Sequence, residues 1–285
     1  EEESFSRAAR RLGISPPAVT RSILTLEDDL GVKLLTRTTR QVRVTEAGGR
    51  YLEDARRILA EVAEADEAAA GINAAPRGNL AVTAPVLFGY MYVMQGIVDY
   101  LRHYPDMTVS ALFVDRVVNL IDEGLDVGVR IGELPDSSMR AIRTGQVRRV
   151  ACAAPAYLKA HGVPRRPADL TRHAIISASA VSPRAEWKFS DEGKSTAVRI
   201  QPRLTVTSNR AAVEAALAGF GVTQLLSYQI APHLAAGTLK IVLGEFEPPP
   251  LPIHVLHREG RQASAKVRAF VDLTVERLRS DKALR

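Results

Sequence analysis

The sequence contains a single cysteine, Cys152, so no disulfide can form within the chain. The residues around it, RVACAAPAY, are mostly apolar and indicate a buried thiol in a strand. A chain without disulfides fits a reducing compartment. No apolar run approaches the roughly 18 residues that a membrane span needs, and no signal-peptide pattern opens the chain. We therefore expect a soluble, cytoplasmic protein without a membrane partner.

Motifs of common enzyme and metal sites are also missing. The sequence has no G-x-S-x-G, no Walker loop, no H-E-x-x-H and no C-x-x-C. The fragment Gly219-Phe220-Gly221 resembles half of a dinucleotide fingerprint, but it ends a predicted helix and leads into a strand, which is the wrong order. His254 and His257 fall on opposite faces of a predicted strand, so they cannot bind one metal ion together. We expect no enzyme activity, no metal and no cofactor.

Positive charge is concentrated near the N-terminus. The 285 residues carry a formal net charge of +6 and are long enough for two or three folded units. Between Arg7 and Arg43 there are eight Lys or Arg residues against three acidic ones, a local excess of five. This excess indicates a polyanionic partner, and a solvated basic surface is the alternative.

The segment RLGISPPAVTRSI predicts a helix that begins at Ser15. Serine is a favoured N-cap, and Pro16 and Pro17 fit the first turn, where the missing N–H costs nothing. An apolar stripe at spacings of 4, 3 and 4 follows: Val19, Ile23, Leu26 and Leu30. At 100° per residue, Arg21 then points outward and Thr20 lies on the flank.

A basic hairpin and a long helix are predicted next. KLLTRTTRQVRVTEAG alternates apolar and basic residues as a hairpin does, and the long helix opens at Thr45. Its apolar residues keep an unbroken heptad spacing: Tyr51, Ala55, Ile58, Val62, Ala65, Ala69 and Ile72. Such a seam favours a partner helix, with packing on its own domain as the alternative. The segment NAAPRG, residues 73–78, breaks the helix as a hinge.

Beyond the hinge, strands and helices alternate. LAVTA, TVSALFV and DVGVRIG read as strands, with a helix up to Tyr104 and a short helix over 117–124 between them, which makes a βαβαβ unit. A second unit runs from about residue 155 to 250. Three prolines precede a last strand, PIHVLH, and the prolines suggest a crossing back toward the first unit before the terminal helix.

The segment RAARRLGISPPAVTRSILTLEDDLGVKLLTRTTRQVRVTEAG resembles the winged helix-turn-helix of LysR-type transcriptional regulators. The positions that match the family pattern are Ala8, Ala9, Leu12, Ser15, Ala18, Val19, Thr20, Leu26, Glu27, Leu30, Gly31, Leu34, Arg37, Thr45, Ala47 and Gly48. The resemblance continues along the chain through TAPVLFG, YLRHYP, EGLDVGVRIG, PAYLKAHG, WKF, AALAGFGV and KVRAF.

The resemblance implies a mixed fold: an all-α winged helix-turn-helix domain, a long linker helix, and an α/β domain like a type II periplasmic binding protein with two lobes. We place the DNA-binding domain at 1–45, the dimerisation helix at 46–73, the hinge at 74–78 and the effector domain at 79–285. Lobe I would span about 79–152 and 251–285, and lobe II about 153–250. The family has one more helix upstream, so we expect a segment to be missing before Glu1.

The resemblance also implies partners: promoter DNA with a partly palindromic site, and a homodimer that pairs into a tetramer as a dimer of dimers. Arg21 suits a guanine edge, and the first turn of its helix suits a phosphate. Pro16 stands where many members have a polar residue, so readout should depend more on Arg21 and Thr20. The candidate DNA-binding residues are Ser15, Pro16, Pro17, Thr20, Arg21, Arg37, Thr38, Thr39 and Arg40.

The small-molecule effector is expected between the lobes, outside the carboxyl ends of strands. The candidate effector-binding residues are Ala84, Pro85, Phe88, Asp115, Arg130, Ile131, Ser208, Asn209 and Thr223. Asn209 is equally well explained as a helix cap, and Arg130 as a structural partner of Asp126 or Asp115. Two helix starts and an arginine at one cleft suggest a small carboxylate, and Asp115 argues against a multiply charged one.

These features predict a sequence-specific transcriptional regulator modulated by a small organic anion. A transport-type solute-binding protein would share the large domain but not the basic N-terminal segment or the heptad helix. A non-specific nucleoid protein would use the basic segment alone and bind specific and scrambled DNA equally.

Overall fold

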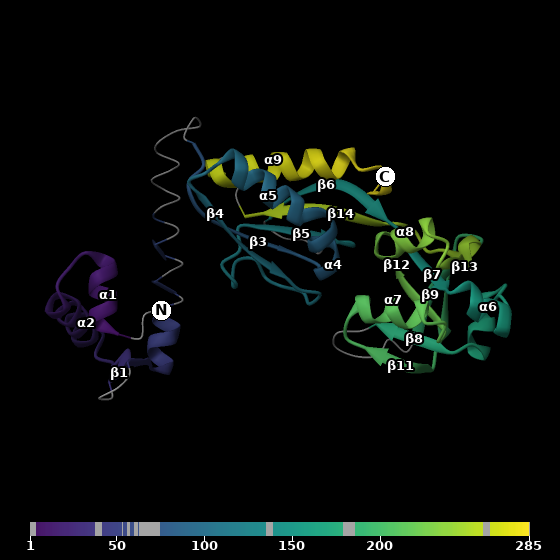
Figure 1. Ribbon diagram of the computed structural model, residues 1–285, viewed down its shortest axis with the longest axis horizontal. Helices are drawn as coiled ribbons and strands as arrows, with labels where there is room; N and C mark the ends of the chain where they lie inside the picture. The colour runs from purple at the N-terminus through teal and green to yellow at the C-terminus, as the bar shows by residue number, and fades with distance from the viewer. Residues whose placement is uncertain are drawn as a thin grey trace. The chain divides into compact units, whose positions relative to one another are not determined.

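The computed structural model describes residues 4–37, 42–52, 54–55, 58–59, 62, 75–134, 139–178, 186–258 and 263–284 (Figure 1). The chain divides into two compact units, Glu1–Gly71 and Ile72–Arg285. In the described ranges, no helix is long and apolar enough to cross a membrane.

The N-terminal unit is a pair of helices followed by a hairpin and a further helix. Helix α1 (Phe5–Leu12) packs against α2 (Pro16–Leu30), and Gly13 between them has a φ of 67°, which favours glycine. Strands β1 (Leu35–Arg37) and β2 (Val42–Val44) pair antiparallel. Residues 46–52 are helical, as are 54–55, 58–59 and 62.

Thr45 joins the hairpin to this last helix. Its hydroxyl oxygen Oγ1 accepts a hydrogen bond from the N–H of Gly48 at 2.9 Å and donates to the carbonyl of Lys33 at 2.8 Å. Its own N–H donates to the carbonyl of Leu34 at 2.9 Å. The helix therefore lies so close to β1 that a Cβ on Gly48 would overlap the Leu34 carbonyl oxygen.

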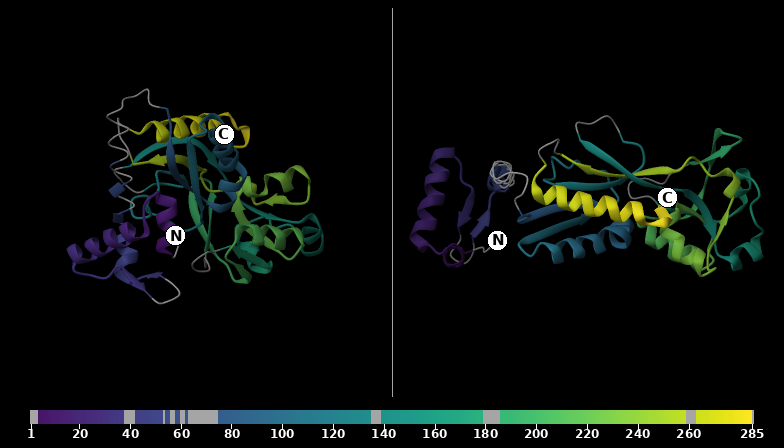
Figure 2. Two further views of the ribbon diagram at one scale, coloured as in Figure 1. Left: turned by 60° about the vertical axis from the view of Figure 1, so that its left-hand side comes forward. Right: turned by 90° about the horizontal axis from the view of Figure 1, so that it is seen from above.

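The first lobe of the C-terminal unit is built on a mixed sheet with the strand order β4-β3-β5-β14-β6. Its strands are β3 (Gly78–Ala84), β4 (Met107–Phe113), β5 (Val127–Ile131), β6 (Arg140–Val147) and β14 (Leu251–His257). β3 is parallel to β4 and β5, and β14 is antiparallel to β5 and β6. The helical segments are α4 (Val86–Phe88), the π-helical turn η1 (Gly89–Val93), α5 (Met94–His103) and α9 (Ala265–Ser280). Helices α5 and α9 lie side by side over the sheet and enclose its main core (Figures 1 and 2).

The second lobe has its own mixed sheet, with the strand order β11-β8-β12-β7-β13. Its strands are β7 (Arg149–Ala153), β8 (Ile175–Ala178), β11 (Pro202–Val206), β12 (Val222–Leu226) and β13 (Lys240–Val242), with a hairpin of β9 (Glu186–Asp191) and β10 (Lys194–Arg199) beside them. The helices are α6 (Pro155–His161), α7 (Asn209–Leu217) and α8 (Ser227–Ala235), and the 3-10 turns of the unit are η2 (Pro167–Arg172), η3 (Gly244–Phe246) and η4 (Lys282–Leu284). Cys152, within β7, is fully buried in the core of this lobe, and burial raises the pKa of its thiol to about 12, so it stays protonated.

Residues 117–124, for which the sequence predicts a short helix, are not helical, and residues 120–124 form turns. Val118, Leu120 and Leu125 pack against Leu256 on the face of the first sheet away from α9. The apolar residues of this segment are thus buried without a helix, which is why their spacing misled the prediction.

Strand β7 belongs to the second lobe, although the predicted boundary put residues up to 152 in lobe I. It pairs antiparallel with β12 and β13, so the chain crosses between the lobes at Arg148. A strand buried on both faces has the same apolar pattern in either sheet, and only its partners assign it. The chain returns at residues 248–250, after which β14 joins the first sheet.

We expect Gly48→Ala to destabilise the N-terminal unit, because the new methyl group would push the helix off β1. Overpacking of this kind costs about 1–3 kcal/mol. Gly49→Ala is the matched control, since no atom lies within 4 Å of a Cβ there. Alanine at that helical position gains roughly 0.5–1 kcal/mol. Thermal unfolding should show Tm shifts of opposite sign, and equal shifts would contradict the close approach.

Candidate DNA-binding surface and effector cleft

The start of α2 is built as the sequence predicts. The Ser15 side chain accepts a hydrogen bond from the N–H of Ala18 at 3.4 Å, and Pro16 and Pro17 occupy the first turn. All three are exposed. The helix therefore begins at an exposed end, but its first turn does not offer the N–H groups that the sequence predicts for a phosphate. Pro16 and Pro17 carry no N–H, and the N–H groups of Ala18 and Val19 donate to Ser15. An anion at this end would meet the Ser15 hydroxyl and the positive end of the helix dipole.

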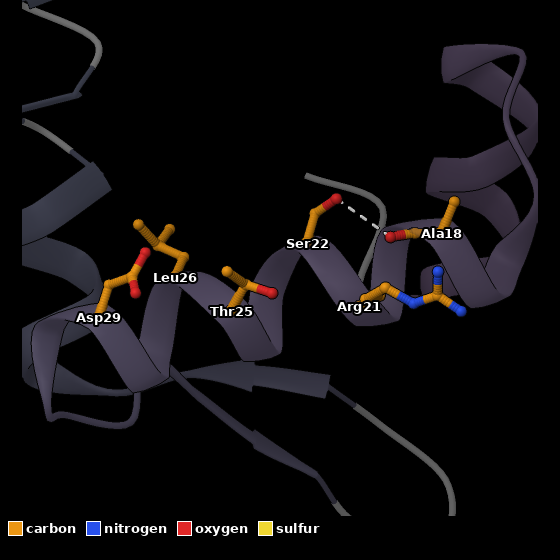
Figure 3. Close-up of a pocket in the computed structure, with 6 residues that line it drawn as sticks. All are labelled: Ala18, Arg21, Ser22, Thr25, Leu26 and Asp29. Carbon is orange, nitrogen blue, oxygen red and sulfur yellow. Dashed lines mark hydrogen bonds between the residues drawn. The ribbon is translucent and has the colours of Figure 1, made fainter.

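One exposed side of α2 forms an open groove (Figure 3). It is lined by Ala18, Arg21, Ser22, Thr25, Leu26 and Asp29. The side chains of Arg21 and Thr25 are exposed, and the Ser22 hydroxyl donates to the carbonyl of Ala18 at 3.1 Å. Thr20 lies half-buried on the flank. Ser22 and Thr25 line the same groove but are not among the predicted DNA-binding residues, although Thr25 follows Arg21 at the four-residue spacing of one helical face.

A buried carboxylate fixes the turn from α2 to the hairpin. Glu27 accepts hydrogen bonds from the N–H groups of Leu34 at 2.9 Å and Leu35 at 3.0 Å, and from the Lys33 ammonium at 2.8 Å. The bond from Lys33, together with those from the backbone, holds the pKa of Glu27 below its usual value. The hairpin is thereby attached to the helix that precedes it. Of the predicted hairpin contacts, Arg37 contributes its backbone to β1, and Thr38, Thr39 and Arg40 lie outside the described residues.

A cavity of about 240 Å³, the inner cavity, lies between the two lobes. It is lined by Pro85, Asp115, Ile131, Arg149, Ser177, Ala178, Trp187, Asn209, Gln224, Leu225, Leu226, Tyr228, Gln229 and Leu251. Four of the predicted effector residues are therefore brought together here: Pro85, Asp115, Ile131 and Asn209. They come from the ends of β3, β4 and β5 and from the start of α7, as expected for strand ends that meet at one cleft.

The other predicted effector residues do not line this cavity. Ala84 and Phe88 are fully buried in the core of the first lobe, and Thr223 is fully buried in the second. Ser208 caps α7 by accepting from the N–H of Ala211 at 3.5 Å. Of these four residues, only Ala84 ends a strand. Phe88 lies in α4, Ser208 lies at the start of α7, and Thr223 lies near the amino end of β12 rather than at its carboxyl end.

Arg130 does not line the inner cavity, in contrast to its predicted place among the effector-binding residues. Its guanidinium donates to the carbonyl oxygens of Val118 at 3.2 Å and Val129 at 3.3 Å, so it holds the 117–124 segment and pairs with neither Asp126 nor Asp115. Burial lowers the pKa of Arg130. Successive side chains of a strand point to opposite faces, and Ile131 is the one that reaches the cavity.

The cationic group of the cleft is Arg149, which the prediction missed. It is the first residue of β7 and is half-buried at the point where the chain enters the second lobe. The sequence signal was the pair Arg148-Arg149 directly before an apolar strand. Arg148 is held elsewhere, because its guanidinium contacts the Glu247 carboxylate at 3.0 Å.

Asp115 connects the two lobes. Its Oδ1 accepts a hydrogen bond from the N–H of Val86, the first residue of α4, at 3.0 Å. Its Oδ2 accepts from the side-chain amide of Asn209, the first residue of α7, at 3.3 Å. The starts of α4 and α7 at the cleft thus already donate hydrogen bonds to side chains of the protein. The start of α7 also donates to the Ser208 hydroxyl, through the N–H of Ala211.

The rings of Phe88, Tyr92 and Tyr228 form an aromatic cluster between the two lobes. The Tyr228 ring, from α8 of the second lobe, stands edge-on to Phe88 at 5.2 Å and to Tyr92 at 5.9 Å in the first lobe. Burial raises the pKa of Tyr228, so its hydroxyl stays neutral. The hydroxyl accepts a hydrogen bond from the Gln229 side chain at 3.3 Å.

A second, outer cavity of about 600 Å³ adjoins the inner one and shares Arg149, Gln224 and Leu251 with it. Its other lining residues are Glu133, Glu186, Lys188, Phe189, Ser190, Gly193, Ser195, Pro248, Pro249 and Pro250. No cluster of three metal-ligating side chains occurs in the described part of the chain. His254 and His257 lie on opposite faces of β14, since Ile253 and Val255 alternate with His254 into the first core.

Two family profiles match this architecture. Residues 1–49 match the bacterial regulatory helix-turn-helix protein, lysR family, and residues 73–279 match the LysR substrate binding domain. The chain belongs to the LysR family of transcriptional regulators. The resemblance deduced from the helix-turn-helix residues is thereby confirmed.

Individual relatives agree with the family match. The chain is 33% identical over 270 residues to the HTH-type transcriptional activator AaeR of Escherichia coli K12, covering 94% of this chain and 87% of AaeR. It resembles the structure of CrgA, a LysR-type regulator from Neisseria meningitidis, with a TM-score of 0.65 and 30% identity over 98% of this chain and 95% of CrgA. It also resembles the full-length Vibrio cholerae virulence activator AphB, with a TM-score of 0.66 and 25% identity over 96% and 94% of the two chains.

As a LysR-type regulator, the protein binds DNA through its helix-turn-helix, binds a small-molecule effector in its two-lobed domain and forms oligomers. The family consists of transcriptional regulators and not of enzymes. The transport-type alternative is not favoured, because a lysR helix-turn-helix precedes the two lobes.

Asn209→Asp tests the contact between the lobes. An acidic residue at the first position of α7 should by itself favour the helix, but here it would face the Asp115 carboxylate. We expect Asn209→Asp to lower the stability of the C-terminal unit at pH 7 by about 1 kcal/mol, as repulsion between exposed charges would. Asn209→Ala serves as the control that removes only the donor.

The exchange variant Asp115→Asn with Asn209→Asp restores one carboxylate and one amide, so its Tm should recover most of the loss. Thermal unfolding of the four proteins measures both effects. A stable Asn209→Asp variant with no recovery in the exchange variant would contradict the contact.

Proposed function

We propose that this regulator reads DNA with the exposed face of α2 and anchors itself with the α2 start and the hairpin. Arg21 and Thr20 would read bases, while Ser15, Arg37 and Arg40 would bind phosphates. The remaining residues of the proposed DNA contact are Pro16, Pro17, Thr38 and Thr39. The exposure of Arg21 in the groove of α2 supports this assignment. Ser22 and Thr25, on the same groove, join the candidates for base contacts.

We further propose that residues 46–73 form the dimer contact, so that two helix-turn-helix domains read a partly palindromic site and dimers pair into tetramers. Three of the four described members of the heptad seam support this, and the fourth, Ala55, is half-buried. Tyr51, Ile58 and Val62 are 37%, 53% and 53% exposed within one chain. Apolar side chains at heptad spacing and open to solvent are what a second copy of the helix would cover. Because it acts on DNA, we place the protein in the cytoplasm.

The effector of this regulator is proposed to be a small organic anion bound in the inner cavity. Arg149 carries this proposal, because it is the cationic side chain among the residues that line the cavity. A guanidinium binds a carboxylate through two parallel hydrogen bonds. Arg149 thus takes the role for which the sequence favoured Arg130.

Effector binding is proposed to change the closure of the two lobes and, through residues 74–78 and the contacts between subunits, the spacing of the DNA-binding domains. The proposed domains are 1–45, 46–73 and 79–285, with the first lobe ending at 147. Such coupling requires the effector to bind one arrangement of the lobes better than the other.

The DNA assignment predicts that Arg21→Ala relaxes the preference at one base position by roughly 1–3 kcal/mol. Arg10→Ala, which removes an exposed charge from α1, should leave base preference unchanged. Footprinting and a salt titration on promoter DNA and a scrambled sequence measure this. An Arg21→Ala footprint with unaltered affinity and preference would refute the assignment, and equal wild-type affinity for both DNAs would favour non-specific binding.

The effector assignment is tested with a panel of small mono- and dicarboxylates, scored by thermal shift and then by footprint and DNA bend. We expect a carboxylate that stabilises the protein to change the footprint or the DNA bend. Arg149→Gln should weaken the binding of that carboxylate about tenfold or more, because one charge-assisted pair is lost. Arg148→Gln is the matched control, since Arg148 is bound to Glu247. A binding carboxylate that alters neither footprint nor bend would end the proposal.

A further inference from the structure

The inner cavity carries two opposite charges. Asp115 and Arg149 are its acidic and basic lining residues, and the other side chains around it are neutral. They come from different lobes: Asp115 follows β4, and Arg149 opens β7. A ligand in this cavity therefore meets a carboxylate from the first lobe and a guanidinium from the second.

The surroundings of Asp115 do not suit a ligand carboxylate. The N–H of Val86 and the amide of Asn209 both donate to Asp115. A ligand carboxylate placed there would face a like charge, with these donors already used. A carboxylate has about four acceptor positions, so Asp115, with two accepted hydrogen bonds, retains capacity for a further donor.

The outer cavity adds acidic groups. Glu133 and Glu186 line it together with Lys188, and Arg149 is shared. Across the two cavities, three carboxylates (Asp115, Glu133 and Glu186) thus stand against two cations (Arg149 and Lys188). This balance disfavours a dianion and favours a ligand that carries a positive charge of its own.

We propose that the effector is a zwitterion of the α-amino acid class, with its carboxylate on Arg149 and its ammonium on Asp115. The volume of about 240 Å³ lies below the range of about 300–1,000 Å³ typical of ligand pockets, which limits the ligand to a small one. Ile131, Leu226 and Leu251 offer an apolar wall to its side chain. This inference rests on the proposed function, since it takes the inner cavity as the effector site. It adds that the effector carries a positive charge as well as a carboxylate.

The test compares matched ligands on the full-length wild-type protein. Each proteinogenic L-amino acid is measured beside its des-amino carboxylate and its decarboxylated amine, for example L-valine beside 3-methylbutanoate and 2-methylpropylamine. Thermal shift identifies binding, and titration calorimetry gives Kd. We expect at least one amino acid to bind about tenfold or more tightly than both of its counterparts, because each lacks one charge-assisted contact.

Two variants test which side chain binds which charged group of the ligand. Asp115→Asn should abolish the preference for the amino acid over its des-amino carboxylate. Arg149→Gln should abolish the preference for the amino acid over its amine. Glu247→Gln is a control outside the lining of both cavities and should preserve both preferences. The wild-type comparison of the three ligands stands even if a variant fails to fold.

The outcomes separate this inference from the proposed function. Des-amino carboxylates that bind as tightly as amino acids, in a manner dependent on Arg149, would overturn the zwitterion and leave the anionic effector standing. Amines that bind without any carboxylate doing so would overturn both. Absence of binding by every amino acid would overturn the zwitterion alone, because the carboxylate panel with its footprints judges the anionic effector separately.

Discussion

The hydrogen bonds of the Asp115 carboxylate are the interaction on which the effector cleft depends. One oxygen accepts from the start of the helical segment that runs from Val86 to His103, and the other accepts from Asn209 at the start of α7. One side chain therefore fixes the end of a helix in each lobe. The proposed effector, bound beside this carboxylate, would change the charge or hydration around it and would so act on both lobes at once.

The lobes are also joined by an aromatic contact, which involves Tyr228 from the lining of the same cavity. In this contact Tyr228 of the second lobe packs against Phe88 and Tyr92 of the first. Opening such a packed contact loses burial and dispersion energy that water does not replace. Opening the contact of Asp115 with Asn209 exchanges one hydrogen bond for others made to water or ligand, at a much smaller net cost. Of these two contacts between the lobes, the hydrogen bond of Asp115 with Asn209 is thus the one that opens at the smaller cost.

Local rules predicted the parts of both sites that depend on neighbouring residues. Ser15 and the two prolines define the start of α2, and the strand ends of the βαβ units bring Pro85, Asp115 and Asn209 to one cleft. The errors have non-local causes. Arg130 and Ile131 differ only in which face of β5 they occupy, and that depends on the packing of the whole sheet. Strand β7 has the same apolar pattern in either lobe, so Arg149 could not be assigned to the cleft before its partners were known.

The position of Arg149 links ligand recognition to the movement of the lobes. The chain passes into the second lobe at Arg148 and returns through residues 248–250, just after Glu247. The ion pair of Arg148 with Glu247 ties these two crossings together. The next side chain, Arg149, points into the cleft and lines both cavities. Two successive arginines thus differ in place: Arg148 ties the two crossings together, and Arg149 lines the cavities and is the arginine proposed to bind the ligand. In the proposed site, a ligand anion on Arg149 would therefore act directly on the first residue of β7, where the chain enters the second lobe.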